Sequence, residues 1–502
     1  MFEASLNGLI SVFTWPTFPL MMIGVLIGFI IGILPGISAP TTLALMLPFT
    51  FHMTPVEAFA FLLGMLSVSI MFGDVTSILF GVPGEPLAAA VVLDGHPMAK
   101  KGETGRALGA ALMSSLVGAA IGAFILAASI PIIRPIVLAF ASPEFFGLAL
   151  LGIAFVAALS GGKMTKGVLM GAVGLMLSMI GLDPQSGTQR YTFGQLELWD
   201  GIGLIPVTVG MFGVGELVDL WVKQKSISER RLGKIGGLWQ GCKDTFIYWG
   251  VTVRCSLLGT FLGIIPGLGG SVGQWVSYAH AVQSAEDKGG FGKGDVRGVL
   301  GPGAAMNAKE GGNLITTVAF GVPSSVSMAI LLGAFLIQGL VPGPSMLTTR
   351  VELTLSFVWV IIVSHVISVA LCFLLINQMV RITEIRSSLI LPGIVFLVLF
   401  GGFSEKNSIF DMGITLVAGF AGMIMIHLDW PRPPLILGLV LGKLIENNLF
   451  ISYSRYEFGF FTRPVLLVII AIGIALVVAP LVQERLARRL GVKEKLVVAE
   501  EG

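Results

Sequence analysis

The sequence predicts an all-α polytopic membrane protein, built from two inverted repeats with broken or re-entrant helices and crossing the membrane about ten to twelve times. Three observations predict this class. The 502 residues are 55% apolar and only 12% charged, whereas ordinary globular chains carry about a quarter charged residues. Long stretches carry no charge, and their length suits helices rather than the short alternating strands of a membrane barrel. Similar segments also recur about half a chain apart.

Apolar runs of sufficient length predict the individual helices in order. Several runs are interrupted, and 66 glycines among 502 residues suit close helix packing in lipid. Segments 39–56, 84–96 and 270–312 fit either half-helices or re-entrant hairpins. The candidate spans are 18–34, 57–80, 107–130, 144–160, 166–181, 200–221, 247–266, 313–340, 351–378, 388–402, 409–427, 433–450 and 464–483.

Two pairs of segments that interrupt the apolar runs indicate an internal duplication. Segment 33–40 (ILPGISAP) recurs as segment 264–271 (IIPGLGGS), 231 residues later. Segment 76–83 (TSILFGVP) recurs as segment 316–323 (TTVAFGVP), 240 residues later. Both pairs contain a proline beside a glycine or one residue from it, so both halves are expected to break their helices at equivalent places.

A third, weaker match joins segments 206–210 and 434–438. Three matches in the same order favour duplication over chance. The expected organisation is a first transmembrane repeat at 1–222, a basic cytoplasmic linker at 223–243, a second transmembrane repeat at 244–452, an extra C-terminal transmembrane helix in 453–484 and a basic cytoplasmic tail at 485–502.

Basic residues orient the chain, because cytoplasmic loops carry an excess of Lys and Arg. The linker holds six basic residues against one acid, and the tail holds five between 485 and 495. Segment 100–106, after the first Gly-Val-Pro turn, carries three, so it is predicted inside. The equivalent loop, 341–345, is uncharged and is predicted outside. Equivalent loops on opposite sides indicate inverted repeats, with the N-terminus outside and the C-terminus inside.

Inverted repeats with paired helix breaks are typical of secondary transporters, whose substrates bind near the middle of the membrane. A Pro-Gly break leaves unpaired N–H groups and a positive dipole end. In lipid those groups must be satisfied by protein, water or a ligand, and glycine lets a ligand approach the backbone closely. Two facing breaks therefore predict a site for an anion that needs no fixed cation.

The predicted substrate-binding residues lie at the two Pro-Gly breaks, at the two Gly-Val-Pro turns and just before the second turn. An alternative is that the kinks serve helix packing and that the hydroxyls satisfy the helix backbone. Lys309 suits either a substrate carboxylate or its neighbour Glu310, and the sequence leaves both open. The set is Pro35, Gly36, Ser38, Thr41, Gly81, Pro83, Gly84, Pro266, Gly267, Gly269, Gly270, Ser271, Asn307, Lys309, Pro323, Ser324 and Ser325.

A second set of residues is predicted to bind the coupling ion, Na⁺ or H⁺. Ionisable residues within membrane segments mark functional sites, and Asp74 is the leading example. The set is Asp74, Thr76, Ser77, Thr316 and Thr317. No cofactor or metal site is expected, since the five histidines lack ligand spacing. The net charge of +2 suggests no nucleic-acid partner, and the lack of a G-x-x-x-x-G-K-[ST] motif argues against a nucleotide-driven pump.

Taken together, the motifs resemble the large permease subunit of the tripartite tricarboxylate transporters, the TctA family. The similarity covers most of residues 18–450 and is strongest at 32–51 and 93–103, with further stretches at 263–267 and 341–344. The resemblance implies a bacterial inner-membrane permease that takes its substrate from a periplasmic solute-binding protein. It also implies a small membrane subunit as partner, transport driven by an ion gradient, and di- or tricarboxylates as substrates.

The chain departs from the family's pattern where the ligand is expected. Pro323-Ser324 replaces a Pro-Gly, segment 302–308 lacks an acid and an asparagine, and Gly73-Asp74-Val75 replaces a Gly-Gly-Ser. We therefore expect a symporter that imports an organic carboxylate, with its N-terminus periplasmic and its C-terminus cytoplasmic, and not an enzyme. The alternatives are the same fold importing another solute and a membrane-embedded enzyme.

Overall fold

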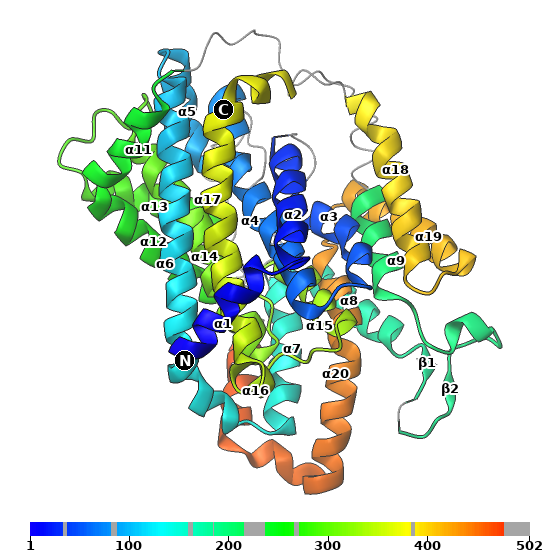
Figure 1. Ribbon diagram of the computed structural model, residues 1–502. Coiled ribbons are helices and arrows are strands. Elements are labelled where there is room, and N and C mark those ends of the chain that lie inside the picture. The colour runs from blue at the N-terminus through cyan, green and yellow to red at the C-terminus, as the bar shows by residue number, and fades with distance from the viewer. Residues whose placement is uncertain are drawn as a thin grey trace, which may run out of the picture. The chain divides into compact units, whose positions relative to one another are not determined.

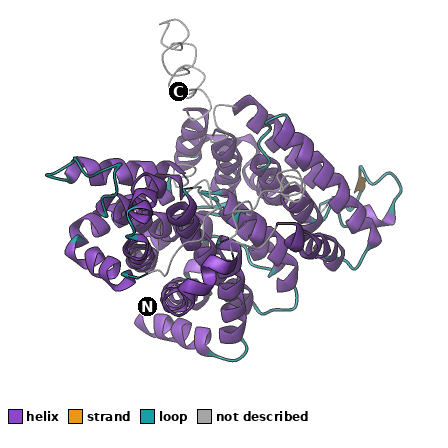
Figure 2. Cartoon of the chain, turned by 90° about the horizontal axis from the view of Figure 1, so that it is seen from above, coloured by secondary structure: helices purple, strands orange, loops and turns teal. Residues whose placement is uncertain are grey.

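The computed structural model describes residues 1–33, 38–81, 88–158, 164–183, 185–214, 236–265, 271–382 and 387–475. Almost all regular structure in these ranges is helix (Figures 1 and 2), which confirms the predicted all-α class. One small element was not expected. Strands β1 (Gly181–Leu182) and β2 (Gln189–Arg190) form a two-stranded antiparallel sheet in which Gly181 pairs with Arg190.

Within the described residues, five helices are long and apolar enough to cross a membrane, and the chain is therefore a multi-pass membrane protein. The number reaches seven if each of two bent helix pairs counts as one span. The predicted total of about ten to twelve spans stays a prediction. The five helices are α4 (Pro55–Phe80), α6 (Thr104–Leu138), α17 (Val351–Ile382), α19 (Ile409–His427) and α20 (Pro433–Tyr456).

The two bent pairs stand at equivalent places in the two halves of the sequence. Helix α1 (Phe2–Phe13) meets α2 (Thr17–Gly32) at a bend of 71°. Helix α11 (Leu238–Ile247) meets α12 (Trp249–Ile264) at a bend of 80°. The remaining elements are α3 (Ala39–Met46), η1 (Leu47–Thr50), α5 (Ala89–Lys100), α7 (Ser142–Ala158), α8 (Met164–Ser178), η3 (Leu196–Leu198), α9 (Leu204–Val209), the π-helical turn η4 (Gly210–Val214), α13 (Ser271–Ser284), α14 (Arg297–Phe320), α15 (Val326–Ile337), α16 (Pro344–Leu347), α18 (Ser387–Ser404) and η5 (Glu457–Thr462).

The predicted single span at 313–340 is wrong. Helix α14 begins sixteen residues earlier, at Arg297, and ends at Phe320. Gly321 then adopts a left-handed conformation with φ 66°, and α15 begins only at Val326. Glycine in this conformation ends helices, and the proline that follows cannot continue one. The segments that the sequence left unassigned hold α3 with η1, α5, and α13 with the first part of α14.

The chain divides into two compact units. The first contains residues 1–139 and 202–428, and the second contains residues 140–201 and 429–502. In the first unit α2 packs on α4, α12 on α14, α14 on α6, α1 on α17, α11 on α6, and α9 with η4 on α18 and α19. In the second unit α20 packs on both α7 and α8.

Glycines allow the helices of the first unit to approach each other closely. A Cβ atom added at Gly28 of α2 would lie 2.3 Å from the carbonyl oxygen of Met65 in α4. Likewise, a Cβ atom at Gly263 of α12 would lie 2.3 Å from the carbonyl oxygen of Lys309 in α14. Such backbone contact through small residues is the usual way to pack helices in lipid. It fixes α4 and α14, which carry most of the candidate site.

Candidate functional site

Both predicted Pro-Gly breaks separate two helices. Helix α2 ends at Gly32 and α3 begins at Ala39, while α12 ends at Ile264 and α13 begins at Ser271. Ser38 caps α3, since its Oγ accepts a hydrogen bond from the Thr41 backbone N–H and lies 2.8 Å from Thr41 Oγ1. The described residues do not include Pro35, Gly36, Pro266, Gly267, Gly269, Gly270 or the side chain of Ser271.

Each predicted Gly-Val-Pro turn follows a long helix that ends in a left-handed glycine. Gly81 after α4 has φ 68°, and Gly321 after α14 has φ 66°. Pro83 and Gly84 lie outside the described residues. In the second turn Pro323 and Ser324 are buried, and Ser325 caps α15 by accepting a hydrogen bond from the Met328 N–H. The turns therefore lie between helix pairs α4–α5 and α14–α15, here called the first and second hairpins.

The hydroxyl groups near these turns donate to the helix backbone. Thr76 and Ser77 both donate to the carbonyl of Gly73, and Ser77 also lies 3.0 Å from the carbonyl oxygen of Ala88. In the second hairpin, Thr316 and Thr317 both donate to the carbonyl of Asn313. These bonds agree with the alternative interpretation of the sequence, in which the hydroxyl groups satisfy the helix backbone. An ion at these residues would use the remaining lone pairs of the hydroxyl oxygens.

Asp74 is a buried residue of α4, with 1% of its surface exposed. Its Oδ1 accepts a hydrogen bond of 3.3 Å from Nε2 of Gln274 on α13, and its Oδ2 has no partner among the residues that the structure describes. The same Gln274 nitrogen lies 2.9 Å from Sδ of Met306 on α14. Gln274 therefore connects α4, α13 and α14.

Among the described residues, no basic side chain pairs with Asp74. A buried carboxylate without a counter-charge costs several kcal/mol in an apolar interior, so it requires a proton or another cation. Among the side chains that the structure describes, the other charged or imidazole groups on helices that contact α4 are Glu3 on α1, Asp94, His96 and Lys100 on α5, Arg106 and Arg134 on α6, His280 on α13, Arg297, Lys309 and Glu310 on α14, and Glu352 and His365 on α17.

Three polar residues of α14 follow one another at intervals of three, so they are neighbours along the helix. Asn307 donates to Ser115 Oγ of α6, and Asn313 Oδ1 accepts a hydrogen bond of 2.8 Å from Ser324 Oγ. Between them, Glu310 pairs with Lys309 at 3.2 Å, and both side chains are buried. The charge of Lys309 is therefore already balanced within the protein.

Several buried polar atoms of the first unit lack a hydrogen-bond partner. Each such atom costs several kcal/mol in a membrane interior unless water, an ion or a ligand satisfies it. Two of these atoms belong to Asp74 and Gln274. The contacts of Gln274 with Asp74 and with Met306 place both side chains beside α14. We take this polar interior of the first unit as the candidate binding site. Among the described residues of α4, α13 and α14, the unpartnered side-chain atoms are Ser69 Oγ, Asp74 Oδ2, Gln274 Oε1, Ser277 Oγ, His280 Nε2, Asn307 Oδ1, Glu310 Oε2 and Asn313 Nδ2.

Sequence reasoning missed part of this site. Gln274 and Ser277 lie in segment 270–312, for which the sequence predicts no single structure. Ser115 lies in the predicted span 107–130, where nothing marks it as a binding residue. The available signal was an amide or hydroxyl inside an apolar run, since such groups need a partner in lipid. Within the described residues, no three His, Cys, Asp or Glu side chains cluster as metal ligands would.

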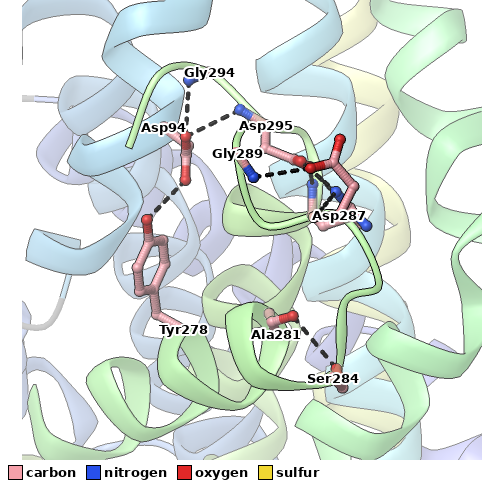
Figure 3. A network of polar contacts seen from close by, with 9 residues as sticks. Asp94, Tyr278, Ala281, Ser284, Asp287, Gly289, Gly294 and Asp295 are labelled. Atoms are coloured by element: carbon pink, nitrogen blue, oxygen red, sulfur yellow. Dashed lines mark hydrogen bonds and ion pairs between the residues drawn. The ribbon is translucent and has the colours of Figure 1, made fainter. Parts of the chain in front are cut away.

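A second polar network surrounds Asp94 of α5, which is fully buried (Figure 3). Asp94 accepts hydrogen bonds from Tyr278 Oη at 2.9 Å and from the backbone N–H groups of Gly294 and Asp295 at 2.8 and 2.9 Å. A Cβ atom at Gly298 would lie 2.0 Å from Asp94 Oδ2, so glycine is required there. Asp94 thus joins the first hairpin to α13 and to the loop before α14.

That loop, residues 285–296, is held by an ion pair and by a hydrogen bond from Lys101. Arg297 donates to both carboxylate oxygens of Asp295, at 3.0 and 2.6 Å. Burial raises the pKa of Asp295, but the hydrogen bonds from Arg297 outweigh burial and leave that pKa below its ordinary value. Lys101 donates to the carbonyl of Lys293 at 2.6 Å. The loop therefore lies at the same end of the unit as the turn between α5 and α6.

The second unit contains a polar pocket of about 250 Å³, lined by residues that include Trp199, Asp200 and Lys443. Its arginine, Arg190, pairs with Asp183 at 3.0 Å and with Glu446 at 2.5 Å. Hydrogen bonds from Ser186 and from the Gln185 N–H, more than the charge of Arg190, lower the pKa of Asp183. Two carboxylates neutralise Arg190, so we assign it to the structure of this loop and not to ligand binding.

We compared the chain with models of protein families and with known proteins. The model of the tripartite tricarboxylate transporter TctA family matches residues 18–437. An uncharacterised 52.8 kDa protein in the TAR-I ttuC' 3' region of Agrobacterium vitis is 33% identical over 484 residues, which cover 95% of each chain. An uncharacterised protein in the TAR-II ttuC' 3' region of the same organism is 30% identical over 234 residues, 46% of this chain and 97% of that relative. No solved structure matches the chain.

Proposed function

The chain belongs to the tripartite tricarboxylate transporter TctA family, and from that premise we propose that it imports an organic di- or tricarboxylate as the large permease of a three-component system. Its proposed partners are a periplasmic solute-binding protein and a small membrane subunit. A Na⁺ or H⁺ gradient drives the import, and the membrane is the bacterial inner membrane. Since the family is a family of transporters, we propose no catalytic residue.

The observation that carries this proposal is the buried carboxylate of Asp74. It lies in a candidate membrane-spanning helix, has one unpartnered oxygen, and has no basic partner among the described residues. A proton or Na⁺ would supply the missing charge, which is the role of a coupling ion. The helix breaks before α3 and α13 supply positive half-helix ends for substrate carboxylates.

The packing of the helices supports an internal duplication. The bent pair α1–α2 matches the bent pair α11–α12, and α1 packs on α17 while α11 packs on α6. Helix α2 packs on α4 through Gly28, and α12 packs on α14 through Gly263. In a transporter with two inverted repeats, such paired contacts are expected around a shared binding site.

Uptake by vesicles tests the proposal. Vesicles with the permease and its small subunit would receive [¹⁴C]lactate, [¹⁴C]succinate or [¹⁴C]citrate, with and without the binding protein, under a Na⁺ gradient, a proton gradient or neither. We expect accumulation of the di- or tricarboxylate only when both the binding protein and one gradient are present. Accumulation without the binding protein would indicate an ordinary carrier, and no uptake of any carboxylate would contradict the substrate class.

One observation favours a second candidate, import of a solute that is not a carboxylate. Lys309, the one lysine of α14, is already paired with Glu310. Anion binding would then rest on the half-helix ends alone. Competition by neutral analogues of the transported carboxylate separates the candidates, because a carboxylate site should reject the uncharged amide or ester.

A further inference from the structure

Helix α13 is hydrogen-bonded to both helices of the first hairpin. Gln274 and Tyr278 are four residues apart on α13, so they share one side of the helix. Gln274 Nε2 donates to Asp74 of α4 at 3.3 Å, and Tyr278 Oη donates to Asp94 of α5 at 2.9 Å (Figure 3 shows the second contact). Two buried aspartates therefore hold one face of α13.

The position of Gln274 along α13 gives the first of these contacts its significance. The helix begins at Ser271, directly after the second Pro-Gly break, so Gln274 lies in its first turn. The N-terminus of α13 is the end that would face a substrate carboxylate in the proposed function. A single side chain thus joins the buried carboxylate that needs a cation to the half-helix that would bind the anion.

An amide is well suited to respond to a cation at Asp74. Its nitrogen donates to a charged carboxylate, whereas its oxygen accepts from a protonated one. In the present arrangement the nitrogen faces Asp74 and Met306, and Gln274 Oε1 has no partner within the described part of the chain. When a proton or Na⁺ neutralises Asp74, the hydrogen bond from Gln274 Nε2 to the Asp74 carboxylate weakens, or the Gln274 amide rotates so that its oxygen faces Asp74. Either change alters how α13 is held.

We propose that Gln274 is the positioning residue that couples cation binding at Asp74 to substrate binding at the N-terminus of α13. The inference rests on the proposed function, since it takes Asp74 as the cation site and α13 as part of the anion site. Coupling of this kind is reciprocal, so the cation strengthens substrate binding by the same factor as substrate strengthens cation binding.

The first test compares two transport assays in the complete system, with the small subunit and the binding protein present. The probes are [¹⁴C]succinate and [¹⁴C]citrate. Gradient-driven accumulation requires coupling, whereas exchange of internal for external substrate without a gradient does not. For Gln274→Leu, which keeps the size but removes the amide, we expect accumulation to fall at least tenfold further than exchange falls, each relative to wild type. Gln274→Asn, which keeps the amide, should recover part of the accumulation.

Two further variants separate the possible failures. Tyr278→Phe removes the other hydrogen bond from the same helix and should keep accumulation within about threefold of wild type. Asp74→Asn removes the cation site and should lose accumulation. Normal accumulation by Gln274→Leu beside a loss in Asp74→Asn would overturn the coupling role and leave the cation site standing. Normal accumulation by Asp74→Asn would instead overturn the cation site, and the coupling role with it.

A second measurement needs no transported substrate. Cys255 is buried on α12, and its Sγ lies 3.6 Å from the carbonyl oxygen of Ser277, so its thiol reports whether α13 is in place. With Cys242 and Cys372 replaced by alanine, the rate of N-ethylmaleimide labelling is measured in Na⁺ against choline and at two pH values. We expect one of these cations to change the rate at least threefold in wild type and Tyr278→Phe but not in Gln274→Leu. The same response in Gln274→Leu as in wild type, or no response in wild type, would contradict the proposal.

Discussion

Single residues in α14 decide how the candidate site carries charge. Lys309 and Glu310 are adjacent, buried and 3.2 Å apart, so each is the counter-charge of the other. Lys309→Met should therefore destabilise the protein by about 3–5 kcal/mol, because it leaves a buried carboxylate unpaired. The double variant Lys309→Met/Glu310→Gln should recover most of that loss. Thermal unfolding of the purified protein in detergent measures both effects.

The same double variant tests the other role that the sequence allowed for Lys309. If its charge serves only Glu310, the double variant should still take up substrate within a few fold of wild type. A double variant that is stable but inactive would show that Lys309 binds the substrate carboxylate. Glu310→Gln alone provides the control, because it frees Lys309 without removing it.

The two left-handed glycines offer a matched pair of residue-scale changes. Among the described residues, a Cβ atom at Gly321 meets only Pro342, at 3.7 Å, so Gly321→Ala should cost about 1 kcal/mol of backbone strain. At Gly81 the added atom would also lie 2.8 Å from the His96 ring. That ring is held by a contact of 3.2 Å between His96 Nδ1 and the carbonyl oxygen of Ile78. Gly81→Ala should therefore lower the unfolding temperature more than Gly321→Ala, and an equal effect would mean that His96 moves freely.

Among the elements, the helices that pack through glycine should be the least tolerant of added atoms. A Cβ atom at Gly28 of α2 would lie 2.3 Å from the Met65 carbonyl oxygen, so α2 and α4 would have to separate. Gly28→Ala should reduce the yield of folded protein and its unfolding temperature. Gly413 on α19 is the control, since no described atom outside the backbone of its own helix lies within 4 Å of its added Cβ. Gly413→Ala should leave stability unchanged or raise it by about 0.5–1 kcal/mol, because alanine favours helix.

At this scale the sequence predicted helices well and their ends poorly. Hydropathy and the Pro-Gly signals located the breaks, as the ends of α2 at Gly32 and α12 at Ile264 show. Hydropathy could not divide 313–340, because the turn at Gly321 is itself apolar and buried. Nor could it show that Gln274 reaches Asp74, a contact between residues 200 positions apart that depends on how α13 packs. The predicted prolines and glycines of both Pro-Gly breaks lie outside the described part of the chain, so their roles stay predictions.

For the whole molecule, the predicted duplication accounts for which segments pack together. Helix α20, which ends the second repeat, packs on α7 and α8 of the first repeat. In the other unit α9 and η4, which end the first repeat, pack on α18 and α19 of the second. Each repeat thus contributes its last helix to the other, so neither is expected to fold alone. Co-expressed halves 1–235 and 236–502 should assemble and purify together, while either half alone should be degraded.

The predicted inversion of the repeats has a consequence for sidedness that one labelling experiment decides. Lys101 and Lys293 are joined by a hydrogen bond, so the loop before α14 must lie on the same side as the basic turn after α5, which the charge rule places in the cytoplasm. Val341, 58% exposed in the equivalent turn of the second repeat, should lie on the opposite side. In a background with the three buried cysteines replaced, Lys293→Cys should react with a membrane-impermeant maleimide only in inside-out vesicles. Val341→Cys should react only in intact cells with a permeabilised outer membrane. Reaction of both from the same side would exclude inverted repeats, because a duplicated loop changes side only if the second copy enters the membrane from the other face.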